Sequence, residues 1–201
     1  MNNFYGDNLF ILQSAMNELL SKIELIRNYQ KMRGQRDPIE HCKGRIKSEE
    51  SMLEKLNRKG LSPTIENALK MIHDAIGVRI VCSFVDDVYA LVGLIKQMPD
   101  WDVLEEKDYI TKPKPSGYRS YHVIIALTIH MPDEARIVHA EIQIRTIAQD
   151  SWAALEHELH YKHNISNVEL IQNELRRCAD EMASTDLTLQ TVRQMINGEI
   201  S

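Results

Sequence analysis

The sequence predicts an α+β fold: a mixed β-sheet of about five strands with flanking helices on one side, and a long helix at each end of the chain. Three observations carry this prediction. Both ends of the chain repeat apolar residues at alternating spacings of three and four, as amphipathic helices do. Short β-branched apolar segments, typical of strands, lie between them. No internal repeat or linker is visible, so a single domain is expected.

The first elements are helical. An apolar stripe near the N-terminus predicts one long helix and consists of Leu9, Leu12, Met16, Leu19, Ile23 and Ile26. Residues 44–60 then predict an extended entry followed by a helix that ends at Gly60. Ser62 resembles an N-cap, with Pro63 at the first helical position, so a short second helix should start there.

The middle of the chain predicts the sheet. Residues 76–84, IGVRIVCSF, are apolar and β-branched and should form a buried strand. A helix is expected at 86–97 and a strand with a charged middle at 101–110. Two further strands are expected at 121–129 and 135–145, joined by a Met-Pro-Asp turn.

The chain ends in two predicted helices. Thr146 and Gln149 form a capping box that opens the helix containing WAALEHELHYK. The last helix has a stripe that only Thr185 interrupts: Val168, Ile171, Leu175, Cys178, Met182, Thr185, Leu189, Val192 and Ile196. Such a helix packs lengthwise on another helix, in its own chain or in a second copy. We expect self-association, because so small a domain can hardly cover so long a helix.

Composition narrows the class of protein. A content of 43% hydrophobic and 26% charged residues is that of a globular chain. The net charge of -5 argues against nonspecific binding to DNA or RNA, so any basic site must be local. Neither a signal peptide nor an apolar run of the ~20 residues that span a membrane is present. The three cysteines lack CxxC spacing, which predicts a cytoplasmic protein without disulfides or zinc.

Two acidic residues are candidate metal ligands. In the strand AEIQIRT, side chains alternate between faces, so Glu141, Gln143 and Arg145 should point the same way. A face made of these groups is costly to bury without partners, although a solvated face fits the pattern equally well. Asp74 lies just before the first predicted strand. If Asp74 faces Glu141, the pair can hold Mg²⁺ against phosphate oxygens.

Local cations accompany these acids in a chain that is acidic overall. They occupy an extended segment, one helix face and a strand: Arg45, Lys47, Lys55, Arg58, Lys59 and Arg79. A solvated helix face explains Lys59, but an unpaired charge within a strand would be costly at Arg79. The set suits a polyphosphate, with lysines as point charges and arginines as forks or stacking surfaces.

The segment PKPSGYRSYH, residues 113–122, has more chemistry than a turn needs. Lys112 and Lys114 alternate with prolines that keep the chain extended, and Gly117 permits close approach of the backbone. Tyr118 can stack on a base, and His122 can reach the same ligand. The loop is therefore expected to hold a planar, anionic molecule.

These segments together resemble the synthetase domain of the RelA/SpoT family, and most closely its stand-alone members, the small alarmone synthetases. The similar segments lie in order between about residues 38 and 163: GRIKS, LEKLNRKG, DAIGVRIVCSFVDD, DYITKPKPSGYRSYH, EIQIRT and WAALEHELHYK. The resemblance implies one nucleotidyltransferase-like synthetase domain over 1–201, with helical extensions at 1–37 and 164–201. It leaves no room for the family's hydrolase domain, so synthesis alone is expected.

The resemblance also implies an activity: transfer of the β,γ-pyrophosphate of ATP to the ribose 3′-hydroxyl of GDP or GTP. The products would be AMP and the stringent-response alarmones ppGpp or pppGpp. Asp74 would bind Mg²⁺, and Glu141 would be the second metal-side carboxylate and the acceptor of the hydroxyl proton. Arg45 and Arg79 would sandwich the adenine.

The remaining implied roles concern phosphates and the acceptor nucleotide. The ATP phosphates would be held by Lys47, Ser51, Lys55 and Arg58. The acceptor would be bound by Tyr118, stacked on guanine, by His122 and Gln143, and through its phosphates by Lys107, Lys112 and Lys114. The family's stand-alone enzymes are often tetramers, which the stripe over 168–196 would fit.

Some alternatives stay open. The mixed segment at residues 105–108 does not decide among GDP, GTP and GMP as acceptor. A toxin-like enzyme of the same fold would modify tRNA instead, although the net charge of -5 argues against this. A catalytically inactive regulator that binds nucleotide or RNA is the second rival. The presence of both Asp74 and Glu141 argues against it.

Overall fold

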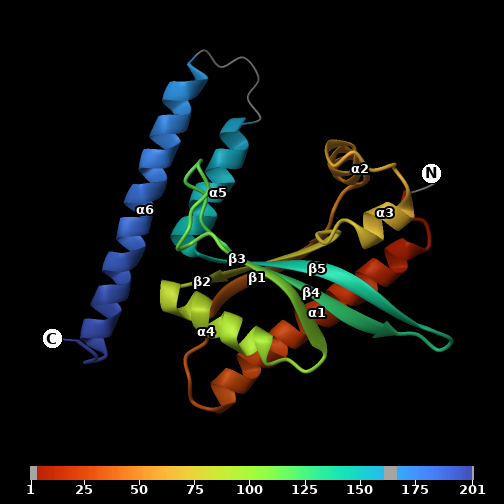
Figure 1. Ribbon diagram of the computed structural model, residues 1–201. Helices are drawn as coiled ribbons and strands as arrows, with labels where there is room; N and C mark the ends of the chain where they lie inside the picture. The colour runs from red at the N-terminus through yellow and green to blue at the C-terminus, as the bar shows by residue number, and fades with distance from the viewer. Residues whose placement is uncertain (1–3, 161–166, 201) are drawn as a thin grey trace.

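A five-stranded mixed β-sheet forms the centre of the computed structural model, which describes residues 4–160 and 167–200 (Figure 1). The strand order is β1-β2-β5-β4-β3; β2 and β5 are parallel and the other neighbours antiparallel. The strands are β1 (Ile39–Ile46), β2 (Ile76–Cys82), β3 (Trp101–Asp108), β4 (Tyr121–His130) and β5 (Ala135–Thr146). The α+β class and the five strands expected from the sequence are confirmed.

The described helices lie on both sides of the sheet. They are α1 (Asn8–Met32), α2 (Glu49–Arg58), α3 (Ile65–Lys70), α4 (Val85–Lys96), α5 (Ile147–His160) and α6 (Val168–Ile196). Figure 1 shows α1 and α4 on one side and α2 and α5 on the other. The expectation of helices on one side was therefore too simple. On the second face, polar side chains of the sheet and of the adjoining segments line two cavities.

The hydrophobic core lies between the sheet and helices α1 and α4. Ala140, Ile142 and Ile144 of β5 are fully buried, as their alternation with Glu141 and Gln143 predicts. They belong to one apolar cluster with the buried stripe of α1 and with α4. Each large apolar side chain buried in this way stabilises the fold by about 1.5–3 kcal/mol. The core thereby fixes which face of the sheet is polar.

Helix boundaries agree with the sequence at most ends. Gly60 ends α2 with a φ of 69°. The predicted capping box is present at the start of α5. The backbone amide of Gln149 donates to Thr146 Oγ1 over 3.1 Å, and the backbone amide of Thr146 donates to Gln149 Oε1 over 3.2 Å. The predicted start at Ser62 was wrong. Thr64 is the N-cap of α3, because its Oγ1 accepts from the Asn67 amide over 3.2 Å. The last two residues of the WAALEHELHYK segment lie outside the described residues.

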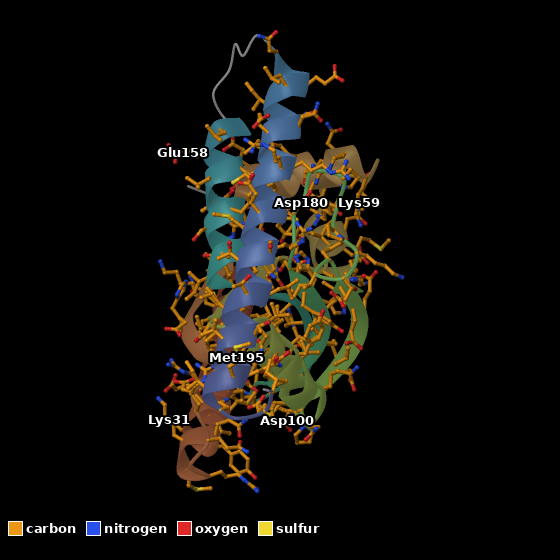
Figure 2. The ribbon with its side chains drawn as sticks, turned by 90° about the vertical axis from the view of Figure 1, so that its left-hand side faces the viewer. Lys31, Lys59, Asp100, Glu158, Asp180 and Met195 are labelled. Carbon is orange, nitrogen blue, oxygen red and sulfur yellow. The ribbon has the colours of Figure 1, made fainter. Side chains whose placement is uncertain are left out.

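Helix α6 runs beside α5, as Figures 1 and 2 both show. The Trp152 indole of α5 donates to the Leu175 carbonyl over 2.8 Å. Further along, Asp186 and Gln190 are buried against the rest of the chain, whereas Leu189 and Val192 are exposed. None of the described helices is long and apolar enough to cross a membrane.

Candidate active site

A row of polar side chains crosses the sheet on the face opposite α1 and α4. The register pairs Lys43 with Arg79, Arg79 with Gln143, Gln143 with His122, and His122 with Lys107. Residues paired directly across neighbouring strands point to the same face. One side chain from each strand therefore joins the row. Four of the five are candidate site residues from the sequence, and Lys43 is an addition.

Two cavities open on this face and share three lining residues, Asp74, Glu141 and Gln143. The β1-side cavity has a volume of about 290 Å³, and its other lining residues with polar side chains are His41, Lys43, Arg45, Lys47, Arg79 and Asp150. The loop-side cavity has a volume of about 470 Å³ and is also lined by Lys55, Lys107, Tyr109, Lys114, Ser116, Tyr118, His122 and Glu156. The site is thus a pair of cation-rich cavities that meet at two carboxylates.

Asp74 has one oxygen paired and one available. Its Oδ2 accepts from Lys55 Nζ over 2.5 Å and lies 3.2 Å from Lys47 Nζ. Its Oδ1 is buried without a hydrogen-bond partner among the described residues. A buried, unpaired carboxylate oxygen beside a second carboxylate suits Mg²⁺, which prefers oxygen ligands and keeps waters or phosphate oxygens for the rest of its shell.

Glu141 is held by two neighbours. His122 Nδ1 lies 3.2 Å from its Oε1, and Gln143 Nε2 donates to its Oε2 over 2.6 Å. Burial raises the pKa of Glu141, but the hydrogen bond and charge of His122, the hydrogen bond from Gln143 and the charge of Lys55 outweigh it and lower the pKa to about 2. Glu141 is therefore ionised at neutral pH, as a ligand for Mg²⁺ must be.

A closed ring of hydrogen bonds extends from Glu141 to the loop. The Tyr118 hydroxyl lies 2.8 Å from His122 Nε2 and accepts from Arg145 Nη2 over 2.6 Å. The same Nη2 donates to Gln143 Oε1 over 3.0 Å, and Gln143 returns to Glu141. Arg145 lies on the face that the sequence predicts. Its role in the ring, which is to connect Tyr118 with Gln143, was not predicted.

The loop is held from behind by α6. Gly117 has a φ of 93°, and a Cβ at this position would lie 2.7 Å from the Cβ of Ala179. Arg119 Nη1 donates to the Ala179 carbonyl over 3.3 Å and its Nη2 donates to Asp180 over 2.9 Å. The close backbone approach that Gly117 permits is thus to a helix of the same chain, and it fixes the position of Tyr118.

Not every candidate residue lines a cavity. Ser51, Arg58 and Lys112 are exposed and lie outside both linings, and their roles remain predictions. The other residues to which the resemblance assigns a role line one cavity or both, whereas Lys59 and Arg145 line neither. Sequence reasoning missed His41 and Lys43, although their alternation with Arg45 could have shown them had the strand been extended backwards. It also missed Asp150, which no local pattern marks.

The chain is similar to proteins of known kind over most of its length. Residues 44–166 match the model described as a region found in RelA / SpoT proteins. GTP pyrophosphokinase YwaC of Bacillus subtilis (strain 168) is 42% identical over 176 residues, covering 88% of this chain and 84% of YwaC. GTP pyrophosphokinase YjbM of the same organism is 34% identical over 181 residues, covering 90% and 84%.

A solved structure agrees with these sequence matches. The crystal structure of small alarmone synthetase 1 from Bacillus subtilis, bound to its product pppGpp, matches this fold with a TM-score of 0.85. The sequence identity is 32%, and the match covers 94% of this chain and 96% of that chain.

Proposed function

The chain belongs to the RelA/SpoT family, and we propose that it transfers the β,γ-pyrophosphate of ATP to the 3′-hydroxyl of GDP or GTP. The 3′-oxygen forms a bond to the β-phosphorus, and the bond from that phosphorus to the oxygen of the α-phosphate breaks. AMP leaves, and ppGpp or pppGpp forms. The hydroxyl proton passes to a base in the site. Relatives named GTP pyrophosphokinases and a structure bound to pppGpp support this reaction.

One observation supports the proposal most strongly: Asp74, Glu141 and Gln143 line both cavities. A transfer between two nucleotides needs two subsites that meet where the bond forms. Phosphoryl-type transfer depends on positioning and charge neutralisation, and the protein need not form a covalent bond. Two cation-lined cavities with carboxylates at their junction meet that need.

The β1-side cavity is assigned to ATP. Arg45 and Arg79 line this cavity and present planar guanidinium groups for the adenine. Lys47 of the same cavity and Lys55 of the loop-side cavity both lie beside Asp74, where the phosphates would reach the junction. Ser51 and Arg58 are outside the cavity lining, so we place them at its margin, near the phosphates.

The loop-side cavity is assigned to the acceptor nucleotide. Tyr118 provides a ring for guanine, and His122 and Gln143 lie between that ring and Glu141. Lys107 and Lys114 line the cavity and suit the acceptor phosphates. Lys112 is exposed and outside the lining, and its proposed role at these phosphates rests on the resemblance alone. GDP and GTP both fit this assignment, and GMP is the third acceptor to compare.

Two carboxylates have proposed roles in the reaction: Asp74 and Glu141 as ligands of Mg²⁺, and Glu141 also as the acceptor of the 3′-hydroxyl proton. Mg²⁺, bound by Asp74 and Glu141, would neutralise phosphate charge and polarise the phosphorus centre. The described residues contain no group of three or more His, Cys, Asp or Glu side chains that could hold a metal, so bound phosphate and water would complete its shell. Glu141 takes the 3′-hydroxyl proton, and His122 beside its Oε1 orients it.

We extend the proposal to the whole chain. Residues 1–201 form a single synthetase domain with a catalytic core at about 38–163, part of which lies beyond the described residues. The protein works in the cytoplasm, to which its free Cys42, Cys82 and Cys178 are suited, and its partners include neither DNA nor membranes. The exposed apolar side of α6 supports a homo-oligomer, with a tetramer favoured.

The activity is tested by mixing the protein with Mg²⁺, ATP and GDP and separating the nucleotides by anion exchange. We expect a guanosine product more highly charged than GTP, together with an equimolar amount of AMP. ADP in place of AMP, or no product with GDP, GTP or GMP, would contradict the proposal. Deacylated tRNA with labelled ATP then tests the tRNA rival, and label on RNA would establish it.

The role of Glu141 gives the first prediction. Glu141→Gln should abolish turnover, because an amide neither accepts the proton nor neutralises Mg²⁺. ATP binding measured by calorimetry should stay within about tenfold, or ~1.4 kcal/mol. Glu54→Gln, an exposed acid-to-amide change on α2, should leave turnover unchanged. Unaltered turnover in Glu141→Gln would refute the assigned role.

A further inference from the structure

Asp150, in the first turn of α5, binds two arginines at once. Its Oδ1 lies 3.1 Å from an Arg145 nitrogen and 3.3 Å from an Arg79 nitrogen. Its Oδ2 lies 4.0 Å from His41 Nε2. The Asp150 side chain is only 19% exposed, so these contacts are partly shielded from water. A single carboxylate oxygen therefore connects strands β2 and β5.

The two arginines would otherwise repel each other. They lie on the same face of neighbouring parallel strands, because Arg79 pairs with Gln143 and Arg145 follows two residues later. Burial and the charge of Arg145 lower the pKa of Arg79, whereas the charge of Asp150 raises it. Asp150 thus compensates the like-charge repulsion between the two guanidinium groups.

Each arginine serves a different cavity. Arg79 lines the β1-side cavity, which we assign to ATP. Arg145 donates to the Tyr118 hydroxyl and to Gln143 Oε1, both part of the loop-side cavity assigned to the acceptor. The path from one cavity to the other therefore runs from Arg79 through Asp150 to Arg145 and Tyr118.

We propose that Asp150 is a positioning residue that joins the two nucleotide subsites, holding Arg79 for ATP and, through Arg145, Tyr118 for the guanine nucleotide. This inference rests on the proposed function. Asp150 acts through the two arginines and contributes no group to the reacting atoms. The simpler explanation is that an acid in the first turn only stabilises α5 through the helix dipole. The two explanations differ in what Asp150→Asn does to nucleotide binding.

The test measures KM for both substrates in Asp150→Asn. We expect the KM for ATP and the KM for GDP each to rise by about tenfold, since the amide loses the charge that pairs both arginines. Binding of a non-hydrolysable ATP analogue without acceptor, and of GDP without ATP, should weaken to a similar extent. Asp150→Glu keeps the charge and should restore part of both losses. Glu158→Gln, an exposed acid-to-amide change on the same helix (Figure 2), should change none of these values.

A second variant tests the connection itself. Arg145→Met should weaken binding of the ATP analogue although Arg145 lies on the acceptor side, and this loss should largely disappear when Asp150→Asn is already present. A drop in thermal stability without a change in either KM would overturn the inference in favour of the helix-dipole explanation. A rise in only one KM would overturn it as well, because the subsites would then not be joined.

Failure of the inference and failure of the proposed function give different results. If the wild-type protein makes no alarmone, the proposed function fails, whatever Asp150 does. If it makes alarmone and Asp150→Asn matches it in both KM values, the inference alone fails.

Discussion

Glu141 combines strong acidity with a central position. Its pKa of about 2 means that it stays charged at any physiological pH, so its charge would always be available to the proposed Mg²⁺. The same acidity makes it a weak base in the nucleotide-free site. If Glu141 accepts the proton of the 3′-hydroxyl, as we propose, that proton would leave late, when the oxygen is already bonding to phosphorus and has become more acidic. In this view, charge placement contributes more to the rate than proton abstraction does.

Tyr118 gives a prediction that separates its ring from its hydroxyl. Tyr118→Ala removes both and should weaken the guanine nucleotide by about 1–3 kcal/mol without changing the KM for ATP. Tyr118→Phe keeps the ring but removes the hydroxyl that contacts Arg145 and His122. If stacking dominates, this variant should weaken binding of the guanine nucleotide less than Tyr118→Ala does. Steady-state kinetics with GDP varied at saturating ATP would measure both.

Two outcomes would contradict this assignment. An unaltered acceptor KM in Tyr118→Ala would leave Tyr118 with the structural task of holding Arg145. Equal losses in the two variants would show that the hydroxyl and its hydrogen-bonded ring matter, and that stacking does not.

At the residue scale, the sequence revealed what depends on local geometry. Alternation of side chains along β5 placed Glu141 and Gln143 on the same, polar face. This prediction was possible because alternation is a property of the strand alone and does not depend on the rest of the fold. Asp150 could not be found in this way, because its role depends on how the first turn of α5 lies against β2. The hydrogen-bond ring around Tyr118 likewise requires two strands and a loop in contact.

Element boundaries show the same division. Stripes with spacings of three and four located α1 and α6, and a capping box located the start of α5. The start of α3 was misplaced because Ser62, Pro63 and Thr64 all suit a helix start, and the hydroxyl that caps the helix is that of Thr64. Which helices cover which face of the sheet was beyond local patterns.

The contact between α5 and α6 has an unusual polar centre. Asp186 of α6 is buried, and its Oδ2 accepts from Thr146 Oγ1 over 2.5 Å. Thr146 is also the N-cap of α5, so one hydroxyl caps one helix and binds the other. Burial raises the pKa of Asp186, and the hydrogen bond from Thr146 only partly opposes it. The ionised carboxylate is therefore a cost to the folded state at neutral pH.

This contact gives a prediction for pH dependence. Because the pKa of Asp186 is higher in the folded state than its ordinary 3.8, folding favours the protonated form, and the cost of its charge disappears as pH falls through the folded pKa. Asp186→Asn, which still accepts the Thr146 hydrogen bond, should therefore melt above wild type at about pH 7.5, with the gap closing toward about pH 4.

Thermal melts at several pH values would measure this gap, with the exposed Glu158→Gln as control. A variant less stable than wild type at every pH would show that the charge itself stabilises the contact between α5 and α6, contrary to the prediction.

At the scale of the whole molecule, the second half of α6 buries polar side chains and exposes apolar ones, the reverse of what the hydrophobic effect favours. Its polar Asp186 and Gln190 face inward, while Leu189 and Val192, at 52% and 44% exposure, face outward. Gln190 Oε1 accepts from the Asp86 amide over 3.3 Å, so its inward position is tied to α4. Apolar residues that recur along one exposed helix face are typical of a protein–protein contact. A second copy of the chain is the partner that the proposed oligomer implies.

The last prediction tests that oligomer. Leu189→Glu combined with Val192→Glu should shift the protein from an oligomer, with a tetramer favoured, to a smaller species in light scattering after gel filtration. Both positions are exposed within one chain. The free energy of unfolding of the dissociated species should therefore change only by the amount typical of surface substitutions, about 0.5 kcal/mol or less. Leu104→Glu, which changes an exposed leucine on β3, should leave the mass unchanged.

A wild type that is monomeric at micromolar concentration would contradict the proposal. Since α6 also holds Gly117 and Arg119 behind Tyr118, dissociation that raises the KM for GDP alone would connect assembly to the acceptor subsite.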